Sequence, residues 1–77
     1  MKNKAKEMFE KLGFKQTINS KIIAYEKFSQ LIGHQRIEFD LFDKTIIADD
    51  TYKSMYIDID TFKAINQQLK ELGWLDY

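Results

Sequence analysis

The chain contains no cysteine. It therefore has no disulfide bonds, no thiolate ligands for a metal and no cysteine nucleophile for covalent catalysis. Its stability must come from an apolar core alone, and a chain of 77 residues can build only a small one. A small core makes association with a second copy of the chain favourable, so a homodimer is among the partners that the sequence allows.

Long apolar segments and an excess of one charge are also missing. No segment approaches the roughly 20 apolar residues of a membrane span, and the basic N-terminus is not followed by the apolar stretch of a signal peptide. We therefore expect a cytoplasmic protein with no membrane partner. Twelve basic and twelve acidic residues give a net charge of zero, which disfavours nucleic acid as the main partner.

The charges are nevertheless unevenly distributed along the chain. Residues 1–30 carry seven lysines and three glutamates, whereas residues 31–60 carry three basic and seven acidic side chains. Such an asymmetry favours a self-complementary or oriented contact, although a solvated mixed surface gives the same pattern.

Apolar residues recur at helical spacing near the N-terminus: Ala5, Met8, Phe9 and Leu12. This spacing predicts an amphipathic helix. Gly13 supplies the left-handed residue that ends a helix, and Phe14 is then placed to pack back on Phe9.

The C-terminal segment repeats this design with a second apolar stripe: Phe62, Ile65, Leu69 and Leu72. It predicts a helix with Asp60 as its N-cap. Gly73 is expected to end the helix. Trp74 is then placed to pack back on Leu69, as Phe14 is on Phe9.

Between the two helices the apolar period is two, which is typical of strands with one buried face. The segments that read as strands are 21–28, 36–41, 45–48 and 55–60. We expect a tight hairpin at Asp43–Lys44 and a loop through Ser29, Gln30 and Gly33. The sequence thus predicts one α+β domain over residues 1–77, with a helix, an antiparallel meander of three to four strands and a second helix. Both helices should pack on one face of the sheet.

Side chains suited to catalysis or to metal binding are few. His34 is the single histidine, and no nucleophile or triad motif surrounds it, so we expect no enzyme. The aspartates that could converge on a hard cation are Asp49, Asp50, Asp58 and Asp60. Their spacing is not that of a calcium loop, and helix-cap and turn roles account for most of them. The sequence predicts no metal site and no cofactor.

Aromatic residues outside the expected core are the best candidates for a binding site: Phe42, Tyr56, Trp74 and Tyr77. Phe42 and Tyr56 fall on the polar-facing positions of their predicted strands. Exposed aromatic side chains are favoured anchors of protein contacts, so these residues predict a protein-interaction surface. The alternative is that the sheet twist or the C-terminal tail covers them.

A second hypothesis starts from lysines in the first part of the chain: Lys4, Lys11, Lys15 and Lys21. Together with nearby aromatic residues they could contact phosphates and stack on bases. The single arginine and the interleaved Glu7 and Glu10 argue against this reading, so nucleic-acid binding is the alternative and not the leading hypothesis.

Three segments carry a resemblance: IDTFKAINQQLKELGW (59–74), AKEMFEKLGF (5–14) and IEFD (37–40). In these the chain resembles the small uncharacterised proteins encoded in phages and prophages of Gram-positive bacteria. The shared motifs are capping and core residues, so the resemblance implies a common fold far more than any chemistry. It also implies an accessory protein that acts in the cytoplasm of the bacterial host by binding a host or phage protein.

Overall fold

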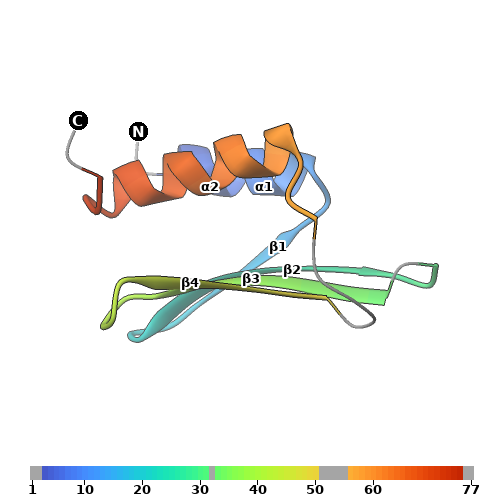
Figure 1. Ribbon diagram of the computed structural model, residues 1–77, viewed down its shortest axis with the longest axis horizontal. Coiled ribbons are helices and arrows are strands. Elements are labelled where there is room, and N and C mark those ends of the chain that lie inside the picture. The colour runs from blue at the N-terminus through green and yellow to red at the C-terminus, as the bar shows by residue number, and fades with distance from the viewer. Residues whose placement is uncertain (1–2, 32, 51–55, 76–77) are drawn as a thin grey trace.

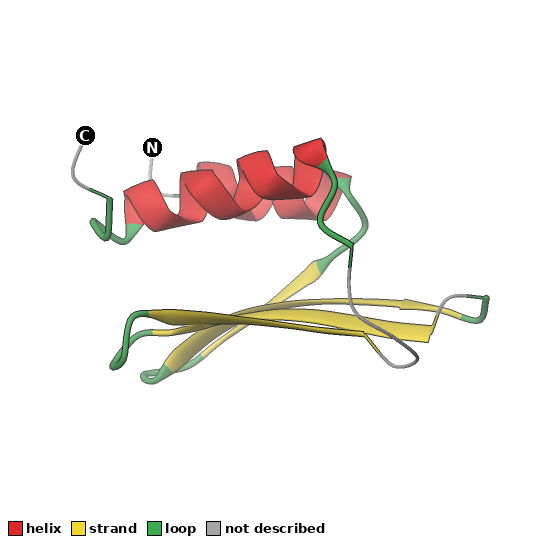
Figure 2. Ribbon diagram, viewed as in Figure 1, coloured by secondary structure: helices red, strands yellow, loops and turns green. Residues whose placement is uncertain are grey.

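Two helices lie side by side on one face of a four-stranded antiparallel sheet (Figures 1 and 2). The elements in chain order are α1 (Lys4–Lys11), β1 (Lys15–Ile18), β2 (Ile22–Ser29), β3 (Gly33–Asp40), β4 (Thr45–Asp50) and α2 (Ile59–Glu71). The computed structural model describes residues 3–31, 33–50 and 56–75. The strands follow one another across the sheet as a meander. The predicted α+β order, with both helices on one sheet face, is confirmed.

One predicted strand is wrong, and one strand of the sheet was not predicted. The sheet begins with β1 (Lys15–Ile18), which has a single apolar residue and so no visible alternation. The predicted strand at 55–60 is not one, because residues 56–58 have no regular structure and α2 starts at Ile59; Met55 lies outside the described residues. Ile57 instead precedes the N-cap of α2, and Ile59 is the first residue of that helix.

The expected loop after β2 is shorter than predicted. Ser29 pairs with Gly33, and Phe28 pairs with His34, so both strands run on to the tip of the hairpin. Gly33 has φ 81°, the left-handed conformation that lets the chain reverse here. His34 therefore lies on a strand and not in a loop.

The β3–β4 turn contains no glycine, and hydrogen bonds to an aspartate side chain stabilise it. Asp40 Oδ1 accepts hydrogen bonds from the backbone N–H groups of Phe42 and Asp43, at 2.9 and 2.8 Å. Lys44 takes the left-handed conformation with φ 59°. Side-chain bonds of this kind stabilise turns locally, and here they place Phe42 in the turn rather than on a strand.

Both predicted helix ends are confirmed. The N–H of Phe14 donates to Phe9 O, and that of Trp74 donates to Leu69 O, each at 3.0 Å. The intervening Gly13 has φ 95°, the left-handed conformation that this stop requires. The N-cap of α2 is Asp58 and not the predicted Asp60, which lies in the first turn of the helix.

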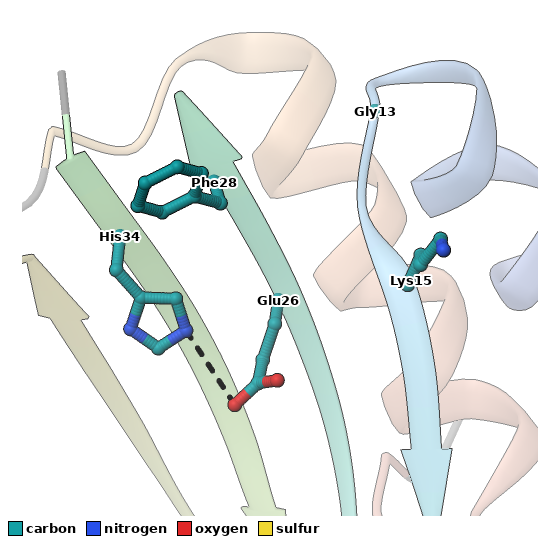
Figure 3. A pocket seen from close by; sticks show the side chains of 5 residues that line it. All are labelled: Gly13, Lys15, Glu26, Phe28 and His34. Carbon is teal, nitrogen blue, oxygen red and sulfur yellow. Dashed lines mark ion pairs between the residues drawn. The ribbon is translucent and has the colours of Figure 1, made fainter. Parts of the chain in front are cut away.

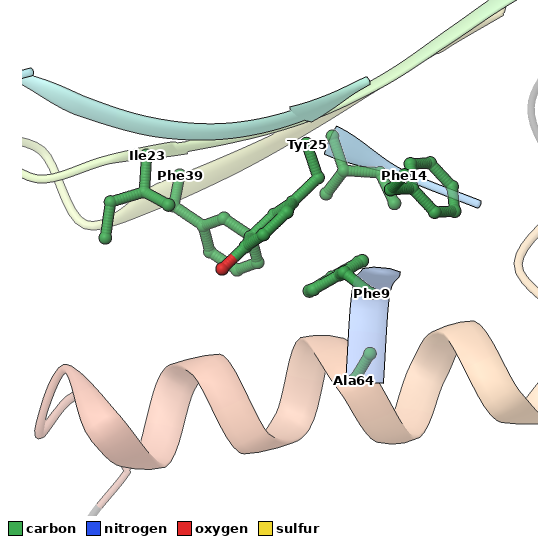
Figure 4. Close-up of a cluster of buried hydrophobic side chains, with 7 residues drawn as sticks. Phe9, Phe14, Ile23, Tyr25, Phe39 and Ala64 are labelled. Atoms are coloured by element: carbon green, nitrogen blue, oxygen red, sulfur yellow. The ribbon is translucent and has the colours of Figure 1, made fainter. Parts of the chain in front are cut away.

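The core lies between the helices and the sheet (Figure 4). Its buried members are Phe9, Phe14, Ile23, Tyr25, Ile37, Phe39 and Ala64. The rings of Phe9 and Tyr25 stack with centroids 3.8 Å apart, which joins α1 to the centre of the sheet.

The buried side of α2 is not the predicted stripe. Phe62 is 56% exposed, whereas Thr61, Ala64 and Gln68 are buried. The physical reason is the contact between α1 and α2: Ala64 is fully buried in the core cluster that contains Phe9 of α1, and a small side chain lets two helices approach closely. The remaining predicted residues, Ile65, Leu69 and Leu72, are partly buried against the core. Neither described helix is long and apolar enough to cross a membrane.

Candidate functional site

The helices leave one face of the sheet uncovered. Because side chains alternate along a strand, the residues between those of the core point to this second face. We call it the outer face, and its members on the four strands are Lys15, Thr17, Ile22, Ala24, Glu26, Phe28, His34, Arg36, Glu38, Asp40, Thr45, Ile47 and Asp49. Charged and polar residues together predominate, as expected for a sheet with one solvated side.

A shallow hollow of about 350 Å³ lies at one end of the outer face (Figure 3). Its lining residues are Gly13, Lys15, Glu26, Phe28 and His34. The register places Glu26 between Lys15 of β1 and Arg36 of β3, and Phe28 beside His34. Three neighbouring strands thus contribute side chains to one small surface.

Ion pairs link the charged groups of the hollow. His34 Nε2 lies 3.5 Å from Glu26 Oε2, as the dashed line in Figure 3 marks. The same Glu26 oxygen accepts a hydrogen bond from the Arg36 guanidinium, whose other side contacts Glu38 Oε1 at 3.0 Å. The hydrogen bond that Arg36 donates to Glu26 is the main cause of a raised pKa of Arg36, so the guanidinium is charged at any physiological pH. The network orients these side chains without filling the hollow.

Phe28 stands out within this charged surface because its side chain is 73% exposed. Leu31 follows at the tip of the same hairpin and is 92% exposed. Large apolar side chains in water next to fixed polar groups are typical of protein-binding surfaces.

The corner that borders the hollow is held by Lys27. Its Nζ donates to Leu12 O at 3.1 Å and lies 4.6 Å from the centre of the Phe14 ring. A Cβ added to Gly13 would meet Lys27 Cδ at 3.1 Å, so this glycine serves close packing as well as the helix stop. The link between α1 and β1 is therefore fixed where it meets the hollow.

The hollow is lined by the side chains of Lys15, Glu26, Phe28 and His34, with Gly13 beside them. None of its described lining residues carries a hydroxyl or thiol nucleophile for the His34–Glu26 pair to activate. In residues 3–31, 33–50 and 56–75, no three His, Asp or Glu side chains form a group able to hold a metal ion. Among the predicted aspartates, Asp58 caps α2 and Asp50 accepts from Gln35.

The four aromatic residues singled out from the sequence do not form one surface. Phe42 is 90% exposed in the turn before β4, and Tyr56 is exposed beyond the other end of that strand. Their predicted strand positions are wrong, and of the two alternatives both residues follow the exposed one. Trp74 packs against Phe39, with centroids 6.5 Å apart, and is partly buried. Tyr77 lies outside the described residues.

The four predicted lysines are also dispersed. Lys4 and Lys11 are exposed on α1, in the helical layer. Lys15 lies on the outer face of the sheet, on the opposite side, and Lys21 lies in the β1–β2 turn. No single phosphate-binding surface joins these four.

No protein-family model, curated protein or solved structure matches this chain. The resemblance to phage-encoded proteins therefore stays a prediction. The candidate site rests on the geometry of the chain itself.

Sequence reasoning missed Phe28, Glu26 and Arg36 as members of one site. The signal was present in the alternation: once Tyr25 is placed in the core, Glu26 and Phe28 must both lie on the opposite, outer face of the strand. The consecutive apolar run Ile22–Tyr25 hid the register of this strand.

Proposed function

We propose that the chain is a non-enzymatic protein-binding module whose partner docks on the outer face, at the hollow beside Phe28. One observation carries this proposal: a 73% exposed phenylalanine stands next to an ion-paired network on the sheet face opposite both helices. The apolar surface of such a side chain is removed from water only when a partner covers it, and this burial is favourable.

The charged rim supplies specificity to such a contact. Glu26 and Arg36 already hold each other in place, so little side-chain entropy is lost when a partner binds beside them. A charged rim also steers the encounter and disfavours wrong partners. From the phage resemblance we further propose that the partner is a host or phage protein in a bacterial cytoplasm.

The test is a comparison of three tagged baits in a Gram-positive lysate treated with nuclease: wild type, Phe28→Ala and Phe42→Ala. Phe42 is the matched control, because it is an exposed aromatic residue far from the hollow along the sheet. We expect a protein captured by wild type to be lost with Phe28→Ala and retained with Phe42→Ala. Loss of capture with Phe42→Ala alone would place the binding site at the β3–β4 turn. Equal capture by all three baits would refute binding at the hollow.

Nucleic-acid binding through the α1 lysines is the alternative. It predicts capture that disappears with nuclease, and an affinity for DNA or RNA that falls steeply as salt rises from 50 to 200 mM, on the order of a thousandfold if several phosphates are contacted. Because Lys4 and Lys11 lie on the helical layer, Lys4→Ala and Lys11→Ala should then weaken binding while Phe28→Ala leaves it unchanged.

A further inference from the structure

A second surface lies in the helical layer, on the side of the sheet opposite the outer face (Figure 2). Here a cavity of about 260 Å³ lies between the end of α1 and the start of α2, lined by Met8, Lys11, Leu12, Asp60 and Lys63. We propose that the groove between the two helices binds an amphipathic helix of a partner protein, with acidic residues seven positions apart and a leucine between them. The sheet separates this interhelical groove from the hollow beside Phe28, so the proposal is independent of the function proposed above.

The cavity is suited to one apolar side chain. Met8 and Leu12 form its apolar part, and both are only partly buried against the core. Sites for whole small-molecule ligands usually measure about 300–1,000 Å³, so a cavity of about 260 Å³ is better matched to a single anchoring side chain. A leucine placed here would cover the exposed parts of Met8 and Leu12, and the burial of this apolar surface is favourable.

Lysines border the cavity on both helices. Lys11 belongs to α1 and Lys63 to α2, and both are exposed. The ion pairs of the described residues include neither lysine, although Glu7 and Asp60 stand one helical turn from them. With Asp60 as the one acidic residue of the lining, the cavity carries a net positive charge. A carboxylate of a partner placed between the two lysines would reduce their mutual repulsion.

A second pair of lysines lies at the other end of the groove. Lys4 stands seven residues before Lys11 on α1, and Lys70 stands seven after Lys63 on α2. Residues seven apart lie on the same side of a helix, about 10.5 Å along its axis. At this end Glu71 of α2 accepts hydrogen bonds from the first turn of α1 and from α2 itself, which places the start of α1 beside the end of α2. The groove therefore has a pair of lysines at each end.

The shape and the charges of the groove favour a helix over other acidic partners. A helix pairs its own backbone groups, whereas an extended segment would find no free sheet edge in the helical layer to pair with. Two acidic residues seven positions apart in a helix are also about 10.5 Å apart, which is the spacing of the two lysine pairs. A nucleic acid has no apolar side chain for the cavity, and its phosphates would be repelled by Asp60.

Titration of the isotope-labelled full chain with synthetic peptides, followed by NMR, tests the proposal. The three probes are helical peptides of about fourteen residues, or four turns. The first has two glutamates seven positions apart and a leucine between them, the second has glutamines in their place, and the third has the first composition with the glutamates five positions apart. We expect the first to bind about tenfold more tightly than the other two and to shift the resonances of Met8, Leu12 and Lys63 but not those of Phe28.

Charge reversal in the groove provides the matched variants. We expect Lys63→Glu to weaken binding of the glutamate peptide about tenfold and to strengthen binding of a peptide with lysines in place of the glutamates. Lys21→Glu is the control, because it reverses an exposed lysine in the β1–β2 turn, and it should leave both affinities unchanged. Circular dichroism checks that both variants keep their helices.

Four results would overturn the proposal. The first is no binding of the glutamate peptide up to about 1 mM, and the second is equal binding of the three peptides. The third is a set of shifted resonances confined to the outer face, which would assign the peptide to the hollow instead. The fourth is tighter binding of single-stranded DNA than of the glutamate peptide in the groove, which would make nucleic acid the occupant.

Discussion

Tyr25 is a buried residue of the sheet that contacts both helices. Its ring stacks on Phe9, and its hydroxyl donates a hydrogen bond to Gln68 Oε1 of α2 while it accepts one from Gln16 Nε2 at 3.1 Å. Burial is the main cause of a raised pKa of Tyr25, and the negative charges of Glu71 and Glu10 add to it. The neutral hydroxyl is thus part of the native packing.

Removal of this hydroxyl tests the role of the network. We expect Tyr25→Phe to lower the free energy of unfolding by about 1–3 kcal/mol, because the buried Gln68 oxygen loses its donor. Urea unfolding at pH 7 measures the change. The matched control is Tyr56→Phe, which alters an exposed tyrosine and should change stability by less than about 0.5 kcal/mol.

Because the pKa of Tyr25 is raised, the stability of the protein should fall at high pH. A raised pKa means that the folded state holds the proton more tightly than the unfolded chain, so this stability is present below the ordinary pKa of 10.0 and is lost as the pH rises above it. We expect the wild type to lose more stability between pH 9 and pH 11 than Tyr25→Phe does. Parallel losses in both proteins would contradict this assignment.

Asp58 caps α2, two residues before the predicted Asp60. Its Oδ1 accepts from Thr61 N at 2.8 Å, and this hydrogen bond is the main cause of a lowered pKa of Asp58. Asp60 lies within the first turn of the helix. The prediction erred because both residues are aspartates, and only the backbone conformation decides which of them precedes the first turn.

Paired alanine variants distinguish the two aspartates. We expect Asp58→Ala to lower the melting temperature at pH 7 clearly more than Asp60→Ala, because only Asp58 satisfies a helix N–H group. Since its pKa is lowered, the stability from Asp58 is present above its ordinary pKa and is lost as the pH falls below it. The difference between the two variants should therefore shrink at pH 2–3; a difference that stays constant would count against the capping role.

At the scale of elements, α1 depends on α2 for its start. It has only eight residues, and its own Asn3 forms no side-chain cap. Instead the carboxylate of Glu71, near the end of α2, accepts from the N–H of Ala5 at 2.8 Å. Helices this short are unstable in isolation, so this cap and the core contact of Phe9 hold α1 in place.

The cap between the helices can be removed by one substitution. We expect Glu71→Ala to cost about 1–2 kcal/mol of stability, because it leaves a helix N–H group without its acceptor. The control Glu10→Ala removes an exposed partner of Lys6 at 3.9 Å and should cost less than about 0.5 kcal/mol. Chemical denaturation measures both changes, and similar effects would show that the Glu71 cap adds no stability.

At the scale of the whole molecule, the C-terminal helix stop closes a single core. After Gly73, Trp74 packs against Phe39 of β3. After Gly13, Phe14 packs against Phe9 in the same way. The two stops thus connect both helices to the same cluster of side chains. Such a core should unfold as one cooperative unit.

Trp74 is the only tryptophan and reports on this core directly. We expect its fluorescence and the far-UV circular dichroism to follow one urea transition, with the same midpoint, at a protein concentration where the chain is monomeric. Fluorescence that changes before the helical signal would mean that the C-terminal turn opens independently, contrary to a single core.

Local chemistry allowed much of the fold to be predicted. The two helix stops depend on a glycine and on the aromatic residue that follows it, and both are visible in Leu12-Gly13-Phe14 and Leu72-Gly73-Trp74. The alternation in 36–41 likewise placed Ile37 and Phe39 in the core, because the faces of a strand alternate whatever surrounds it. The candidate site was not predicted, since Phe28, Glu26 and Arg36 become neighbours only through strand pairing.

The sequence by itself determined the order of helix, strands and helix, because capping and periodicity act between residues close in the chain. Only the tertiary structure decided which residues of α2 are buried, that Glu71 caps a helix 66 residues away, and that β1 is a strand at all. The physical reason is that these features depend on long-range contacts. Ala64 is buried because it belongs to the core cluster that contains Phe9 of α1. The polar segment Lys15–Ile18 becomes a strand because it pairs with β2.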